Sequence, residues 1–190
     1  KITKLKTQGN DPKELYLTAR NFLLVIALTA LLLFNLLNEP VLSLFLSHDK
    51  YLKAADYIKC FTLFEVFFVF SIIPNYFLNA AGYEKLYFKI VVFYCVSILS
   101  GMLVGYYFTH TATGIIIGMA LSTAVTMLFQ NWMINQWVFK ERNPLETLAL
   151  FTPAILVGAA IWFETPMLKY SLVAIAFLSI YLIYIRHFKI

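Results

Sequence analysis

One acidic residue lies inside a long apolar run, and its side chain is the strongest candidate in this sequence for a chemical role. Glu65 occurs in the stretch Phe-Thr-Leu-Phe-Glu-Val-Phe-Phe (61–68), with no Lys or Arg one helical turn away. Counting from residue 58 at about 1.5 Å per residue places the carboxyl about 10 Å inside a membrane boundary. An ionisable group at that depth is costly and suggests a function. Glu65 could exchange a proton or cation, accept hydrogen bonds from hydroxyl groups in a central aqueous cavity, or join two helices structurally.

Amide side chains occur at two further places within apolar runs. Asn75 follows Pro74, which removes a backbone hydrogen bond and bends a helix, either for conformational switching or as static packing. Gln130 precedes Asn131, and Asn131 and Asn135 share one helix face because they are four residues apart. We expect these amides to line a cavity open to the cytoplasm or to make hydrogen bonds between helices.

Arg20 stands at the beginning of the first apolar run. Its guanidinium could bind the phosphate of an anionic lipid carrier, or it could simply flank a membrane span on the cytoplasmic side.

Elsewhere the sequence has no His or Cys at metal-ligand spacing and no Gly-rich loop of the nucleotide-binding type. We therefore expect no metal, no cofactor and no enzyme activity.

Composition places all these residues in a membrane protein. Of the 190 residues, 61% are hydrophobic and 13% are charged, against about 25% charged in soluble domains. A hydrocarbon core about 30 Å thick requires about 20 apolar residues in a helix. The runs are too long, and alternate too little, for β-barrel strands. The sequence therefore predicts an all-α transmembrane bundle with six spans, at 17–37, 58–81, 86–108, 114–139, 145–163 and 167–185.

Short punctuated segments separate these spans. Asn38-Glu39-Pro40 is expected to end the first span, and residues 38–57 to rest partly as an amphipathic segment at the membrane interface. Pro144 and Pro166 mark the starts of the last two spans, because a helix start tolerates proline. Residues 1–16 are expected to form a cytoplasmic segment that follows a missing upstream helix, because the chain begins with Lys1 and its first Met is Met102.

The distribution of basic residues predicts the orientation. With six spans, both chain ends share one side, and that side would carry eleven of the fifteen Lys and Arg residues. The positive-inside rule makes this side cytoplasmic. The remaining four basic residues, Lys50, Lys53, Lys59 and Lys169, would lie outside. Because the basic residues are scattered and form no basic face, we expect no nucleic-acid partner.

Small residues recur at four-residue spacing in two neighbouring spans. In a membrane, such rows let helices approach closely. Because a short loop joins the two spans, we expect an antiparallel pair packed along these rows. The row in the third span comprises Ser97, Gly101 and Gly105, and the row in the fourth comprises Gly114, Gly118 and Ser122.

Residues 1–140 resemble the C-terminal region of polysaccharide-biosynthesis flippases of the multidrug/oligosaccharidyl-lipid/polysaccharide exporter superfamily. The resemblance rests on an apolar span that ends in NEPVLSLFL (38–46), an outer YLKAADY (51–57), a turn NAAGYEK (79–85) and a helix start TGIIIGMALST (113–123). Where the family has Gly-Ala-Ala and Tyr-Gly, this chain has Gly118-Met119-Ala120 and Thr113-Gly114, which leaves the subfamily open.

The resemblance implies a bacterial cytoplasmic-membrane protein with two helix lobes around a central cavity, of which this chain would be the C-terminal one. Its substrate would be a lipid-linked oligosaccharide for O-antigen or capsule, moved by alternating access without ATP, with a coupling cation or proton as a further partner. A cation-coupled multidrug exporter of the same superfamily is the nearest alternative. A membrane-embedded polysaccharide polymerase and a structural membrane subunit are alternatives of other classes.

Overall fold

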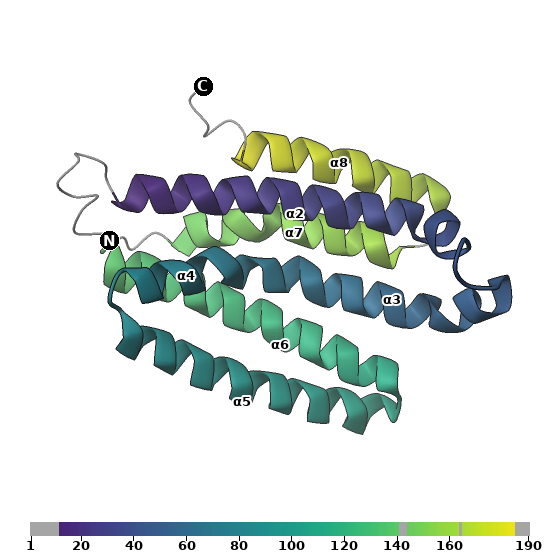
Figure 1. Cartoon of the computed structure of the whole chain (residues 1–190), viewed down its shortest axis with the longest axis horizontal. Helices are drawn as coiled ribbons and strands as arrows, with labels where there is room; N and C mark the ends of the chain where they lie inside the picture. Colours follow the sequence, from purple (N-terminus) through teal and green to yellow (C-terminus); the bar gives the residue numbers. More distant parts are fainter. Residues whose placement is uncertain (1–11, 141–143, 164, 185–190) are drawn as a thin grey trace.

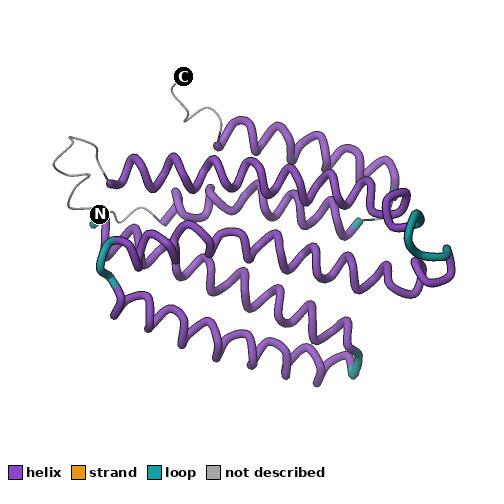
Figure 2. Tube along the Cα trace, viewed as in Figure 1, coloured by secondary structure: helices purple, strands orange, loops and turns teal. Residues whose placement is uncertain are grey.

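A computed structural model describes residues 12–140, 144–163 and 165–184 of the chain. These residues are helical almost throughout and include no strand, as Figure 2 shows. The all-α prediction is confirmed. The helices are α2 (Pro12–Leu42), α3 (His48–Phe68), α4 (Ile72–Ala80), α5 (Glu84–Thr109), α6 (Ala112–Met133), α7 (Pro144–Trp162) and α8 (Pro166–Tyr184).

Two short irregular helices connect or extend these elements, so that the chain makes six crossings. A 3-10 turn, Val69–Ser71, joins α3 to α4, and a π-helix, Ile134–Val138, extends α6. Five crossings are long and apolar enough to span a membrane. The remaining crossing, α7, has 19 residues, or about 28 Å of helix, which is close to the thickness of a hydrocarbon core.

The crossings lie side by side in two layers (Figure 1). Helix α2 and the α3–α4 crossing occupy one layer, and α7 and α6 pack behind them. Helix α8 closes one edge by packing on α7 and α2. Helix α5 forms the other edge, where it packs against α6 and, at one end, against α4.

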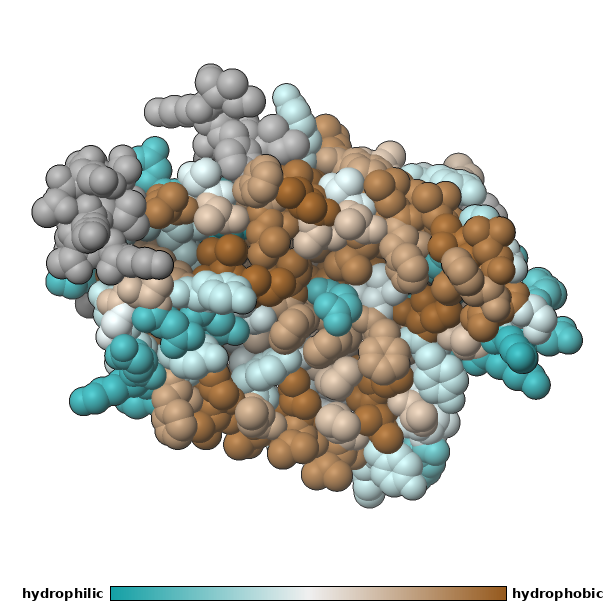
Figure 3. Space-filling model, in the orientation of Figure 1, coloured by the Kyte–Doolittle hydropathy of each residue, from teal (hydrophilic) through white to brown (hydrophobic). Residues whose placement is uncertain are grey.

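Apolar side chains fill the space between the layers. The larger cluster centres on α2, with Leu24, Leu28 and Leu32 almost completely buried, and it includes Phe70 stacked on Phe151 with ring centroids 4.2 Å apart. Many large apolar side chains are exposed, and Figure 3 shows apolar surface over the middle of one face, as expected where lipid covers it. Ordinary soluble proteins avoid such extensive apolar patches.

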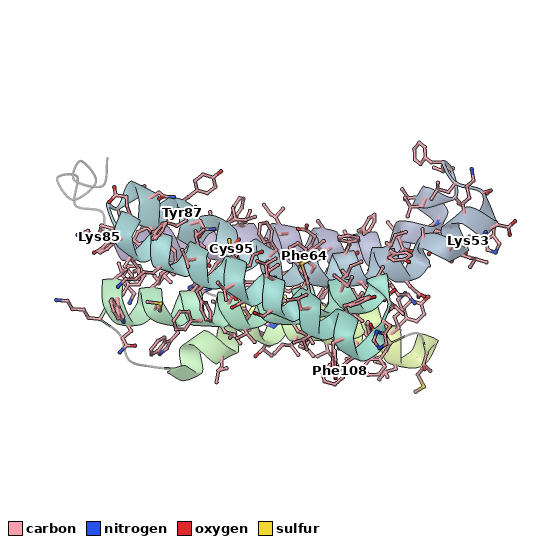
Figure 4. All side chains as sticks on the ribbon, turned by 90° about the horizontal axis from the view of Figure 1, so that it is seen from below. Lys53, Phe64, Lys85, Tyr87, Cys95 and Phe108 are labelled. Carbon is pink, nitrogen blue, oxygen red and sulfur yellow. The ribbon has the colours of Figure 1, made fainter. Side chains whose placement is uncertain are left out.

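The segment between the first two spans differs from the prediction. Helix α2 continues through Pro40 to Leu42, and α3 already begins at His48. Residues 38–57 are therefore mostly helical, and the first turns of α3 project beyond the end of the bundle, as Lys53 shows in Figure 4. Tyr51 donates a 2.9 Å hydrogen bond to Asn38 Oδ1, which joins the two helices. Pro40 is tolerated because its ring affects only the helix's last turns.

Proline positions agree better with the structure elsewhere. Pro144 and Pro166 are the first residues of α7 and α8. Pro74 lies in the first turn of α4, just after the 3-10 turn. Its ring would clash with the carbonyl of Phe70 in a regular helix, which explains why the α-helix is interrupted at this point.

Helices α5 and α6 approach so closely that their backbones touch along the small-residue rows. A methyl group built on Gly118 would overlap the Gly101 carbonyl, and one on Gly105 would overlap the Gly114 carbonyl. Extending this antiparallel register places Ser97 opposite Ser122. The Ser122 hydroxyl donates to the Gly118 carbonyl at 2.8 Å. The rows are therefore the contact surface of this helix pair.

Candidate functional site: polar groups within the bundle

A polar side-chain contact joins α6 to α4. Gln130, fully buried, donates from Nε2 to Asn75 Oδ1 at 2.7 Å. In this crossing, the 3-10 turn that interrupts the helix ends at Ser71, four residues before Asn75. Asn131, 1% exposed, donates to the carbonyl of Met127 on its own helix at 2.9 Å. The amides predicted as a cluster thus divide between an inter-helix bond and an intra-helix bond.

Several buried amide atoms near the same end have no hydrogen-bond partner among the described residues. They include the carbonyl oxygens of Gln130, Asn131 and Gln136. A buried polar atom without a partner costs about 1–3 kcal/mol. Because all three are acceptors on one helix, this end of α6 is suited to a donor such as water or a hydroxyl-bearing ligand.

Asn135 does not extend the α-helical face of Asn131. It lies within the π-helix, whose wider turn changes the angle between residues four apart, and it is half-buried. Such π-helical turns inside longer helices occur frequently at functional sites. The sequence spacing alone could not reveal this, because it assumes a regular helix.

Arg20 is buried in the bundle and does not extend into water. The side chain is 8% exposed, and its Cζ lies 5.3 Å from the centroid of the Tyr16 ring, a cation–π arrangement. Its Nε and Nη2 both approach Asn21 Oδ1 at 3.4 Å. Within the described part of the chain, no carboxylate forms a salt bridge with Arg20. Arg20 is therefore more buried than a basic residue that only flanks a membrane span needs to be.

Glu65 lies apart from these groups, on the outer face of α3. The side chain is exposed, next to the stacked rings of Phe64 and Phe68, and Tyr94 of α5 lies within electrostatic reach. Ten residues separate Glu65 from Asn75, about 15 Å along a helix. Within this chain, Glu65 and Asn75 therefore make no direct contact.

The depth of Glu65 follows from the ends of the neighbouring helices. Helix α6 begins at Ala112 and α7 ends at Trp162, and residues 56–60 of α3 lie beside these ends. Glu65 is thus five to nine residues further in, or about 8–13 Å. In Figure 4 the adjacent Phe64 accordingly lies between the two ends marked by Lys85 and Phe108.

Asn35 is a polar group that the sequence reasoning missed. It occurs in the run Leu-Leu-Leu-Phe-Asn-Leu-Leu, is 3% exposed, and its Nδ2 has no partner in the described part of the chain. An amide inside an apolar run was the available signal, because polar groups at membrane depth are uncommon.

Fold and site together define a polytopic membrane protein: a helical transmembrane bundle with an apolar outer surface and a few polar groups at depth. The chain matches no protein-family model, no curated protein and no solved structure. Within the described residues, no group of His, Cys, Asp and Glu is arranged to hold a metal ion.

Proposed function

We propose that this chain is the C-terminal lobe of a flippase that moves lipid-linked oligosaccharide across a bacterial cytoplasmic membrane. The oligosaccharide serves surface-polysaccharide synthesis, such as O-antigen or capsule. The motion is alternating access between two helix lobes, and the substrate site lies between them. The resemblance over residues 1–140 supplies the family, and the placement of Glu65 supplies the mechanism.

The exposed carboxylate of Glu65 is the observation that carries the proposal. Lipid cannot solvate a carboxylate about 8–13 Å inside the membrane, so this side chain requires water or a second protein element. A cavity between two lobes provides both. The face of α3 that carries Glu65 then lines the cavity, while Val66 of α3 and Val69 and Phe70 of the following 3-10 turn pack into the core.

Transport is tested with the full-length protein in liposomes. A fluorescent lipid-linked oligosaccharide is placed in both leaflets, and the fraction protected from an added periodate or glycosidase reagent is followed with time. We expect the protein to make the protected fraction accessible, and protein-free liposomes to leave it protected. Equal protection with and without protein would contradict the flippase proposal.

A cation-coupled multidrug exporter is the second candidate, because a lone acid at depth also suits a cation or proton site. The same liposomes distinguish the two. An exporter would move a lipophilic cationic dye in response to a proton or sodium gradient and would leave the lipid-linked sugar in place.

The basic residues predict that both chain ends face the cytoplasm. Two exposed positions lie at opposite ends of α5: Ala112, the first residue of α6, and Glu84, the first residue of α5. In a background without Cys60 and Cys95, we expect Ala112→Cys to react with an impermeant maleimide in intact cells. Glu84→Cys should react only after the membrane is permeabilised, and the reverse pattern would invert the orientation.

A further inference from the structure

A cavity opens at the end of the bundle opposite the polar amides. It has a volume of about 500 Å³ and lies where three crossings meet: α3, the start of α6 and the end of α7. Small-molecule sites in proteins occupy about 300–1,000 Å³. Its lining residues are Asp56, Lys59, Cys60, Thr113, Trp162 and Phe163.

One wall of this cavity is aromatic. Trp162, the last residue of α7, is 50% exposed, and Phe163 is 45% exposed. A half-exposed indole offers a flat apolar face together with an N–H donor at its edge. The flat face suits a ring that presents C–H groups, as a pyranose does.

The other wall is polar but carries no net charge. Asp56 of α3 is exposed and supplies a carboxylate acceptor, and Thr113 of α6 supplies a hydroxyl that both donates and accepts. The ammonium of Lys59 balances the carboxylate of Asp56, so an isolated anion or cation would meet a like charge here. A neutral ligand with several hydroxyl groups and one apolar face satisfies both walls.

The cavity lies at the water boundary, in a part of the molecule distinct from Glu65. The α3 residues that line the cavity, Asp56, Lys59 and Cys60, precede Glu65 by five or more residues and lie closer to the end of the bundle. A sugar attached to a membrane-embedded lipid can reach this level while its lipid remains in the bilayer. This reading rests on the proposed function for the source of the sugar, but the binding chemistry does not depend on transport.

We propose that the cavity is a saccharide-binding site at the outward-facing boundary of the cytoplasmic membrane. One neutral sugar unit stacks on the indole of Trp162, and its hydroxyl groups bind the carboxylate of Asp56 and the hydroxyl of Thr113. The site receives the carbohydrate part of the substrate on the outer side.

Binding is measured on the full-length purified protein by the fluorescence of Trp162. In a variant with Trp132→Phe and Trp137→Phe, acrylamide quenching of this chain's remaining tryptophan is recorded with D-glucose, D-galactose, N-acetyl-D-glucosamine and L-rhamnose; tryptophans elsewhere in the full-length protein are also replaced by Phe. At least one sugar should reduce the quenching constant at least about twofold and saturably, as expected when a ring covers the indole face. Asp56→Asn should weaken the apparent affinity about tenfold, because it removes charge-assisted hydrogen bonds.

The matched control retains only Trp137, which is also exposed but lies in the π-helix at the other end of the bundle. Its quenching should not respond to any of the sugars. Protection of Trp162 by glycerophosphoethanolamine but by no sugar would overturn the proposal in favour of a lipid-headgroup site. Absence of saturable protection by any of the four sugars would also overturn it. Failure of transport with intact sugar binding would instead count against the proposed function.

Discussion

Replacing Gly118 by Leu is expected to destabilise the protein by about 3 kcal/mol, the upper end of the usual cost of an overfilled contact. In a domain of this size, that corresponds to a fall in melting temperature of about 6–12 °C. The physical cause is steric. A side chain at this position overlaps the carbonyl of Gly101, which is rigid backbone and cannot move aside alone.

The effect is large because α5 has few other attachments. Its described side chains mostly face outward: Leu99 is 61% exposed and Leu103 is 70% exposed. Its main partners are α6, along the glycine rows, and the end of α4. Separating the two backbones therefore removes most of the packing that holds α5 to the bundle.

Ser100→Leu is the matched control, since Ser100 precedes Gly101 on the same helix but is exposed. A bulky side chain there projects away from the contact with α6 and should change the melting temperature little. Both variants are compared with the wild type by membrane abundance and by thermal unfolding in detergent. A Gly118→Leu variant as stable as Ser100→Leu would show that the α5–α6 contact is looser than the structure describes.

How far the sequence predicts this molecule depends on the property concerned. Hydropathy located the six crossings because the length of an apolar run reports directly on the lipid it must cross. The register of α5 against α6 was also predictable, because Gly101 and Gly118 both lie in rows whose spacing matches the helix repeat. Hydropathy missed the first turns of α3, because helical residues outside the membrane are not required to be apolar.

The rotation of each helix about its own axis was not predictable in the same way. Arg20 stands at the beginning of an apolar run and Glu65 lies inside one, yet Arg20 is buried and Glu65 is exposed. Whether such a side chain is buried depends on which helices pack against its own helix. The sequence of a single span does not contain that information. The pairing of Asn75 with Gln130 has the same origin, since the residues are 55 positions apart.

The second large effect is expected at Glu65. Glu65→Gln should leave folding intact, because the side chain is exposed and surface substitutions usually change stability by less than about 0.5 kcal/mol. Transport should nevertheless fall about tenfold or more, equivalent to at least about 1.4 kcal/mol on the rate-limiting barrier. Gln retains the shape and most of the hydrogen bonds of Glu, but it carries no charge and cannot exchange the carboxyl proton.

Three comparisons separate a role in coupling from a structural role. Glu84→Gln removes an exposed acid at the end of α5 and should leave transport unchanged. Glu65→Asp retains the charge and should recover part of the lost activity. If Glu65 instead faces lipid, Glu65→Leu should be tolerated or even raise the melting temperature, because an apolar side chain is favoured there. If the carboxylate lines an aqueous cavity, the Leu variant should fold but fail to transport.

The measurement is surface-polysaccharide display in cells that lack the full-length protein, complemented by each variant, with membrane abundance determined in parallel. Abundance matters because a poorly folded variant would also reduce display, and the melting temperature of each purified variant identifies that case. Full display by Glu65→Gln at normal abundance would exclude a coupling role for the carboxylate. The exposed acid would then require a different explanation, namely a hydrogen bond to a neighbouring protein element that Gln can also make. Double-mutant cycles between Glu65 and residues of that element would identify the bonding partner.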